Sequence, residues 1–94
     1  MSGPLPVVRL FSRNDCHLCD VAKARIESAG RRVPFRLEVV DIDGDAGLVA
    51  RYNDRVPVVH VNGEEAFAYR VNEKVLVRKL KSLSKRSRRG YGRG

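Results

Sequence analysis

The segment Cys16-His17-Leu18-Cys19 restricts the fold of this chain more than any other, because it holds both cysteines of the sequence at a change of pattern. A short apolar run precedes it and is typical of a buried strand: Val7, Val8, Leu10 and Phe11. Apolar residues after it recur at helical spacing: Leu18, Ala22, Ile26 and Ala29. The pattern therefore predicts a strand, a polar loop over residues 12–15, and a helix that Asp15 or Cys16 caps and that ends near Gly30.

The start of a helix changes the chemistry of a cysteine. Unpaired backbone N–H groups and the helix dipole stabilise an anion there, so Cys16 is expected to be a thiolate nucleophile. Cys19 lies three residues later, on the same side of the first turn. It could attack a mixed disulfide formed on Cys16, and the pair is therefore expected to act as a redox dithiol.

Half of a metal site is the alternative interpretation of two closely spaced cysteines. A mononuclear zinc site needs about four Cys or His ligands, whereas the whole chain has two Cys and two His. A redox dithiol is favoured for that reason, and no bound metal or cofactor is expected. His60 lies in an apolar run, where a structural histidine is favoured over a catalytic one.

Charged neighbours act on Cys16 in both directions. His17 would stabilise a thiolate when protonated, or it would simply lie in solvent. Asp15 and Asp20 disfavour a nearby anion. The residues alone leave the sign of the sum open, and we expect the helix terminus together with Arg13 to prevail.

The rest of the chain alternates between the period of a strand and that of a helix. Strands are expected over residues 5–11, 35–42, 56–61 and 64–69, and helices over residues 16–29, 45–53 and 72–83. A helix joins the first two strands, which should be parallel, while Asn62-Gly63 favours a type I′ hairpin between the last two. The order β-α-β-α-β-β-α predicts an α/β protein with a four-stranded mixed sheet and helices on both faces.

The positive charge is concentrated at the C-terminal end. The chain has 94 residues and a net charge of +8, and residues 78–94 contain eight Lys and Arg but no Asp or Glu. We expect a folded domain over residues 1–83 and a basic, disordered tail over residues 84–94. The tail could contact nucleic acid or an acidic surface weakly, as part of a non-enzymatic binding module, or only improve solubility; the second is favoured.

The composition also bears on location. No apolar run approaches the ~20 residues that span a bilayer, and no secretory signal is recognisable at the N-terminus. Two cysteines at redox spacing do not make a disulfide-stapled secreted scaffold. We therefore expect a cytoplasmic protein that does not contact membranes. A monomer is also expected.

Over residues 7–83 the chain resembles the glutaredoxin branch of the thioredoxin-fold superfamily. The resemblance is carried by residues 10–19, 40–43, 55–58 and 62–63, and is greatest to small glutaredoxin-like proteins with a C-x-L-C motif. It implies a thioredoxin-like fold and a thiol–disulfide oxidoreductase of electron transport. Its partners would be a disulfide-containing protein or a glutathione mixed disulfide, with glutathione as co-substrate.

The resemblance also implies roles for individual residues. Cys16 would be the nucleophile and Cys19 the resolving thiol. Pro57 would follow a cis peptide bond beside Cys16, with the backbone of Val56 presented to an extended peptide or to glutathione. The other expected substrate contacts are Arg13, which could pair with a glutathione carboxylate, His17, and Arg70.

Two segments depart from the family pattern. His17 and Leu18 replace the Pro and Tyr that glutaredoxins typically have between the cysteines. The Gly-Gly…Asp segment that holds one end of glutathione has no clear counterpart, and Asn72 is the nearest substitute for its Asp. A glutathione-assisted iron–sulfur carrier, with a cluster shared between two copies, is a further alternative that the wider family suggests.

Overall fold

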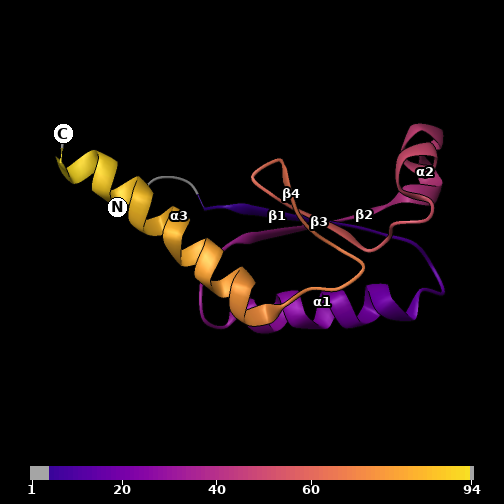
Figure 1. Cartoon of the computed structure of the whole chain (residues 1–94), viewed down its shortest axis with the longest axis horizontal. Helices are drawn as coiled ribbons and strands as arrows, with labels where there is room; N and C mark the ends of the chain where they lie inside the picture. The colour runs from indigo at the N-terminus through magenta and orange to yellow at the C-terminus, as the bar shows by residue number, and fades with distance from the viewer. Residues whose placement is uncertain (1–4, 94) are drawn as a thin grey trace.

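The computed structural model describes residues 5–93, with side chains described up to residue 83. Its elements follow the predicted order, with one added turn of 3₁₀ helix (Figure 1). They are β1 (Val7–Ser12), α1 (His17–Gly30), β2 (Arg36–Asp41), η1 (Ile42–Gly44), α2 (Ala46–Tyr52), β3 (Val58–Val61), β4 (Glu64–Ala68) and α3 (Glu73–Arg93).

The sheet has the strand order β2-β1-β3-β4. β1 is parallel to β2, as the connection through α1 requires, and antiparallel to β3. β3 and β4 form the predicted hairpin, in which both turn residues have positive φ, 51° at Asn62 and 86° at Gly63. These angles belong to a type I′ turn, so the Asn-Gly signal is confirmed.

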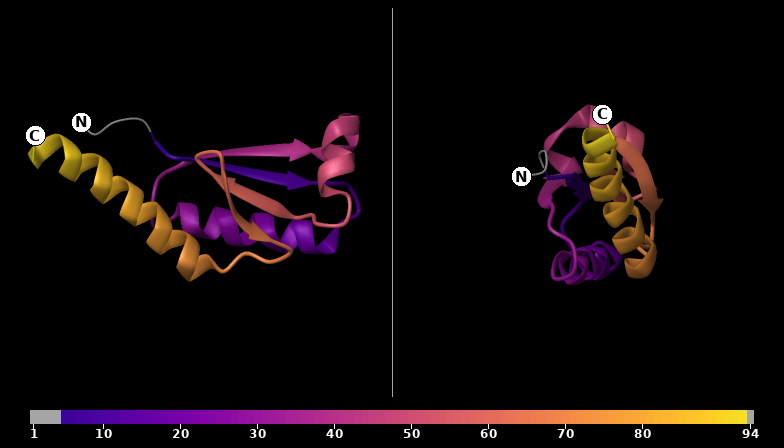
Figure 2. Two further views of the ribbon diagram at one scale, coloured as in Figure 1. Left: turned by 45° about the horizontal axis from the view of Figure 1, so that its top comes forward. Right: turned by 90° about the vertical axis from the view of Figure 1, so that its left-hand side faces the viewer.

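Helices cover both faces of the sheet. Alternate side chains of β1 explain this arrangement, because Leu10 packs in the cluster with α1 and α3, whereas Phe11 packs in the cluster with α2. α2 lies beside the end of the sheet at which the arrows of β1 and β2 terminate (Figure 2). The expected four-stranded mixed sheet between helices is therefore confirmed.

The apolar spacing of residues 72–83 predicts a helix whose stripe is formed by Val75, Leu76, Lys79, Leu80 and Leu83, and the buried stripe of α3 differs from it. Val75 is 42% exposed, whereas Val77 is only 6% exposed. The stripe consists of Leu76, Val77 and Leu80, with Leu83 packed against it. Spacing alone allows either set, and the packing of α3 in one core cluster with α1 and the sheet selects the observed one.

α3 is assigned as far as Arg93, so the backbone of residues 84–93 is helical where the sequence predicts a disordered tail. Their side chains, and residue 94, lie outside the described part of the structure. The division of the chain at residue 83 stays a prediction. None of the helices described is both long enough and apolar enough to cross a membrane.

Candidate functional site

Cys16 and Cys19 form a disulfide at the N-terminal end of α1. Cys16 is the N-cap residue, and its Sγ accepts a hydrogen bond of 3.1 Å from the backbone N–H of Cys19. Cys16 is half-buried, whereas Cys19 is only 3% exposed. The two bonded cysteines are therefore unequal, because Cys16 is more exposed to solvent than Cys19.

A short polar loop brings Cys16 to this position. Asp15 precedes it with φ 56°, and the carbonyl oxygen of Cys16 accepts the first helical hydrogen bond from the N–H of Asp20, at 3.1 Å. His17 and Leu18 are exposed on the first turn. The loop therefore places Cys16, but not Cys19, where solvent can reach it, and a role for His17 stays a prediction.

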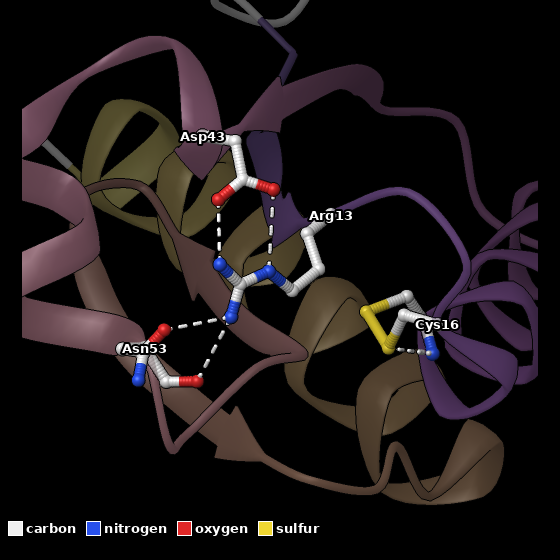
Figure 3. The surroundings of a disulfide bond; sticks show 5 residues. Arg13, Cys16, Asp43 and Asn53 are labelled. Atoms are coloured by element: carbon white, nitrogen blue, oxygen red, sulfur yellow. Dashed lines mark hydrogen bonds and ion pairs between the residues drawn. A yellow bond between two sulfur atoms is a disulfide. The ribbon is translucent and has the colours of Figure 1, made fainter.

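Arg13 lies on the same loop, but its guanidinium group is bound away from the sulfurs (Figure 3). Its Nη2 and Nε donate to the two carboxylate oxygens of Asp43 at 2.5 and 3.3 Å. Its Nη1 donates to the side-chain and main-chain oxygens of Asn53 at 2.8 and 3.3 Å. The Arg13 network, formed by Arg13, Asp43 and Asn53, thus joins the loop before Cys16 to η1 and to the end of α2.

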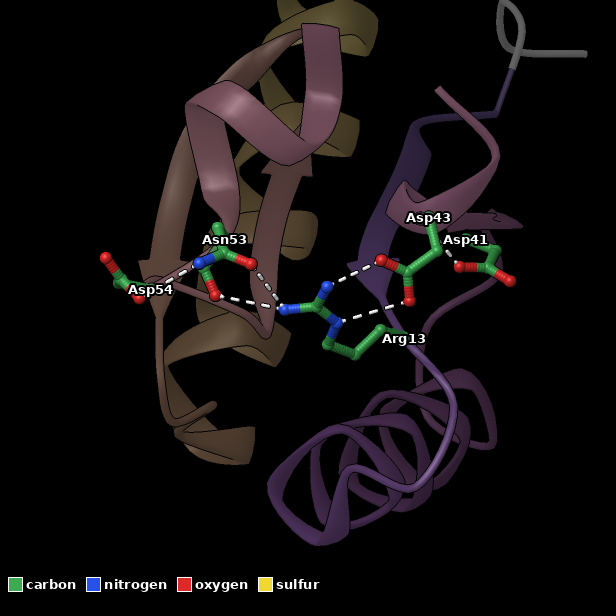
Figure 4. Close-up of polar contacts among 5 residues, drawn as sticks. All are labelled: Arg13, Asp41, Asp43, Asn53 and Asp54. Atoms are coloured by element: carbon green, nitrogen blue, oxygen red, sulfur yellow. Dashed lines mark hydrogen bonds and ion pairs between the residues drawn. The ribbon is translucent and has the colours of Figure 1, made fainter. Parts of the chain in front are cut away.

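The acceptors of Arg13 are themselves held in place (Figure 4). The N–H of Asp43 donates to Asp41 Oδ1 at 2.9 Å, and the side-chain amide of Asn53 donates to Asp54 at 3.2 Å. The side-chain hydrogen bond to Asp43 raises the pKa of Arg13, and the same bond lowers the pKa of Asp43. A substrate carboxylate would have to compete with Asp43 for this guanidinium group.

The Val56–Pro57 peptide bond is cis, as expected from the resemblance. The sheet register pairs Phe11 of β1 with Val58 of β3, so the Cys16 loop and the Val56–Pro57 segment leave the sheet at the same end. Pro57 is buried, and its carbonyl oxygen accepts a hydrogen bond of 2.7 Å from the N–H of Tyr69.

A groove of about 240 Å³ lies beside the cysteine pair. Its lining combines one face of α1 with the loop between β4 and α3: Leu18, Val21, Ala22, Arg25, Tyr69, Arg70 and Val71. Arg70 therefore lies in the same groove as Leu18, a residue of the motif. Sequence reasoning missed Val21 and Arg25, although their spacing of three and seven residues from Leu18 places them on one helical face.

The contacts of His60 agree with the structural role that its position in an apolar run predicts. Its Nε2 lies 3.3 Å from the Tyr52 hydroxyl, and its ring is edge-on to Phe11 with centroids 4.9 Å apart. Burial is the main cause of its lowered pKa. Within residues 5–83, no group of three or more His, Cys, Asp or Glu is arranged to hold a metal ion.

Comparison with known protein families identifies a relationship over most of the chain. Residues 7–81 match the glutaredoxin-like domain family (DUF836). The chain belongs to this family. Its cysteine pair, disulfide-bonded at the start of α1 in a fold of this kind, supports a redox-type function.

Solved structures agree with this assignment. Protein Ne2328 from Nitrosomonas europaea is 30% identical, with a TM-score of 0.73 over 85% of this chain and 96% of that protein. Protein XcR50 from X. campestris is 33% identical, with a TM-score of 0.67 over 80% of this chain and 96% of that one. A mutant thioredoxin from Halobacterium salinarum, 22% identical, has a TM-score of 0.62 over 88% of this chain and 78% of its own, which shows the shared thioredoxin-like fold.

Proposed function

We propose that this glutaredoxin-like domain is a thiol–disulfide oxidoreductase of electron transport. Reduced Cys16 attacks one sulfur of a substrate disulfide, the substrate S–S bond breaks, and the leaving thiolate takes up a proton. Cys19 then attacks the Cys16 sulfur, which releases the second substrate thiol and leaves the Cys16–Cys19 disulfide. Two electrons pass from the dithiol to the substrate.

The observation that carries this proposal is the hydrogen bond from the Cys19 N–H to Cys16 Sγ at the helix N-cap. The same donor, together with the dipole of α1, would stabilise a thiolate on Cys16 in the reduced protein. The exposure of the two residues supports this order of events, because Cys19 is buried and Cys16 is the more exposed of the two.

A thiol reductant returns the disulfide to the dithiol, and we propose glutathione as this co-substrate. Two residues that the resemblance connects with glutathione have other partners. Arg13 is bound to Asp43 and Asn53, and the Asn72 side chain accepts from the N–H of Val75 at 3.1 Å as the cap of α3. We therefore expect glutathione to react at Cys16 while being held weakly, with Val56 as its main-chain contact.

Single-cysteine variants test the proposal. With a glutathionylated peptide as substrate, Cys16→Ser should lose all deglutathionylation above background, because the nucleophile is gone. Cys19→Ser should accumulate a mixed disulfide on Cys16, visible as added mass. Undiminished turnover by Cys16→Ser would contradict the mechanism.

The uneven distribution of charge favours a second candidate, a binding module whose tail contacts nucleic acid. Residues 78–94 contain eight of the 19 Lys and Arg and no carboxylate side chain. This candidate predicts salt-sensitive binding of single-stranded RNA that is lost when residues 84–94 are removed. No observation in residues 5–83 favours the iron–sulfur carrier, which would need ligands from glutathione and a second copy.

A further inference from the structure

The groove beside the disulfide continues into a second hollow along α1 and the start of α3. The first is lined by Arg25 and Arg70, and the second by Arg25, Arg32 and Lys74, so that the two share Arg25 as well as Val71. A hydrogen bond of 3.0 Å from Arg25 Nη1 to the Val71 carbonyl oxygen fixes the point at which they meet. Figure 1 shows how the β4–α3 loop and the start of α3 lie beside α1.

The four cations of this basic groove, Arg25, Arg32, Arg70 and Lys74, are exposed. Carboxylates of the described residues pair instead with other arginines: Arg9, Arg13, Arg36 and Arg55. Glu73, the one acidic residue in the lining, accepts a hydrogen bond of 2.7 Å from the Ser28 hydroxyl. The groove therefore presents positive charge that no carboxylate within residues 5–83 pairs with.

Apolar surface lies at the end of the groove nearest the cysteines. Leu18 is 43% exposed and Tyr69 is 48% exposed, and both line the hollow with Arg70. The main-chain bond from Tyr69 to Pro57 holds this apolar end beside the cis proline. A chain entering from Cys16 would meet apolar surface first and cations further on.

We propose that the basic groove binds an acidic polypeptide segment of the substrate, next to the cysteine that Cys16 attacks. This inference rests on the proposed function and specifies its substrate class. Arg25 lies seven residues beyond Leu18 on α1, about 10 Å along the helix. Arg32 lies in the turn two residues after α1 ends at Gly30, and that end is about 18 Å along the helix from Leu18. An extended peptide covers these distances in about three and six residues, so the acidic residues belong at those separations from the substrate cysteine.

Two fluorescent peptides test the proposal on the full chain. Each carries one cysteine, with Glu in one peptide and Gln in the other at three and six residues on either side of it. With the cysteine replaced by serine, the Glu peptide should bind the oxidised protein about tenfold more tightly at about 50 mM NaCl, since exposed ion pairs contribute modestly but several act together. The difference should shrink at about 500 mM NaCl. Fluorescence anisotropy measures both.

The variant Arg70→Gln/Lys74→Gln should bring the Glu-to-Gln affinity ratio towards one. Arg36→Gln is the matched control, because it removes an exposed cation from edge strand β2 and should keep the wild-type ratio. Equal binding of the two peptides by the wild-type protein, or a preference that survives in the double variant, would overturn the proposal. A single-stranded oligonucleotide that displaces the Glu peptide from the wild-type protein, but does not bind the double variant, would also overturn it. That result would show that the groove binds nucleic acid rather than an acidic polypeptide.

Reduction of the cysteine-containing peptides, as mixed disulfides with a chromogenic thiol, separates docking from chemistry. Release of the chromophore by Cys16 at equal rates from both peptides would support the oxidoreductase activity and contradict the preference for acidic segments. Tighter binding of the Glu peptide without any release of the chromophore would support the docking site and contradict the oxidoreductase activity.

Discussion

Tyr69 holds a backbone conformation that a large side chain rarely adopts. Its φ is 70°, yet its side chain is half exposed and lines the groove beside the cysteines. A glycine would relieve the conformation but would leave the groove without its aromatic wall. A large side chain in this conformation at the surface agrees with the proposed role of the groove in binding, and the hydrogen bond to Pro57 holds Tyr69 at the site.

Replacing Tyr69 by Gly and by Ala distinguishes the effect of the backbone conformation on stability from that of the lost aromatic ring. Both variants lose the aromatic ring, but only Ala keeps the clash of Cβ with its own backbone at positive φ. Tyr69→Gly should therefore unfold with a free energy about 1 kcal/mol higher than that of Tyr69→Ala. Chemical denaturation measures the difference, and a more stable Ala variant would show that the loop relaxes to negative φ.

His60 predicts a pH dependence of stability. Burial lowers its pKa below 6.5 in the folded protein, so the unfolded chain binds a proton at higher pH than the folded one. The contribution of His60 to stability is fully present above pH 6.5 and is lost as the pH falls from there through the folded pKa. Denaturation of wild type between about pH 8 and about pH 5 should show this loss, and His60→Gln should reduce it; an unchanged slope in the variant would contradict the assignment.

At the scale of elements, local patterns predicted more than long-range contacts. The cap at Cys16, the hairpin at Asn62-Gly63 and the order of elements along the chain depend on neighbouring residues, so the sequence contains them. The partners of Arg13 lie 30 and 40 residues away, at Asp43 and Asn53, and no local period indicates them. The same holds for the rotation of α3, because the contact with α1 determines which side chains are buried.

The Arg13 network should fasten the Cys16 loop to η1 and α2. Asp43→Asn should lower the midpoint of thermal unfolding near neutral pH, because the pairing with Arg13 lowers the pKa of Asp43 and so favours its charged form. That contribution is present above the unfolded pKa near 3.8 and is lost as the pH falls through the folded value. Thermal scans at neutral and acidic pH should show the two proteins converging in acid.

Arg13→Lys is the companion variant. A lysine keeps the positive charge but cannot donate to Asp43 and Asn53 at once from a planar group. Arg13→Lys should therefore also have a lower midpoint of thermal unfolding than the wild-type protein. A midpoint equal to that of the wild-type protein would mean that the positive charge alone, without the geometry of the guanidinium group, holds the loop.

The whole molecule combines an electrically balanced part with a basic end. Residues 1–77 contain 11 basic and 11 acidic residues, whereas every charged side chain in residues 78–94 is a Lys or an Arg. The fold, the cysteine pair and the groove lie within residues that the family match covers. The composition of the chain predicted this division in charge, but it contained no sign of the four cations that the fold gathers beside α1. Arg25 and Lys74 lie on two separate helices, and Arg32 and Arg70 lie in the loops that follow α1 and β4.

Removal of residues 84–94 should separate the two parts. The shortened protein should keep its cooperative unfolding and the reactivity of Cys16, because the core described within residues 5–83 is retained in full. Binding to single-stranded RNA should fall at low salt, because the tail supplies cations for phosphate contacts. Loss of the thermal transition in the shortened protein would show instead that the end of α3 stabilises the domain.

The most direct test of the central claim, that the α1 N-cap makes Cys16 the nucleophile, is the rate at which each cysteine of the reduced protein is alkylated at neutral pH. Mass spectrometry of proteolytic fragments after brief exposure to iodoacetamide locates the label. The account predicts that Cys16 reacts faster than Cys19 and faster than free cysteine, because the helix terminus favours its thiolate and solvent reaches it. Labelling of Cys19 first, or of Cys16 no faster than free cysteine, would contradict it.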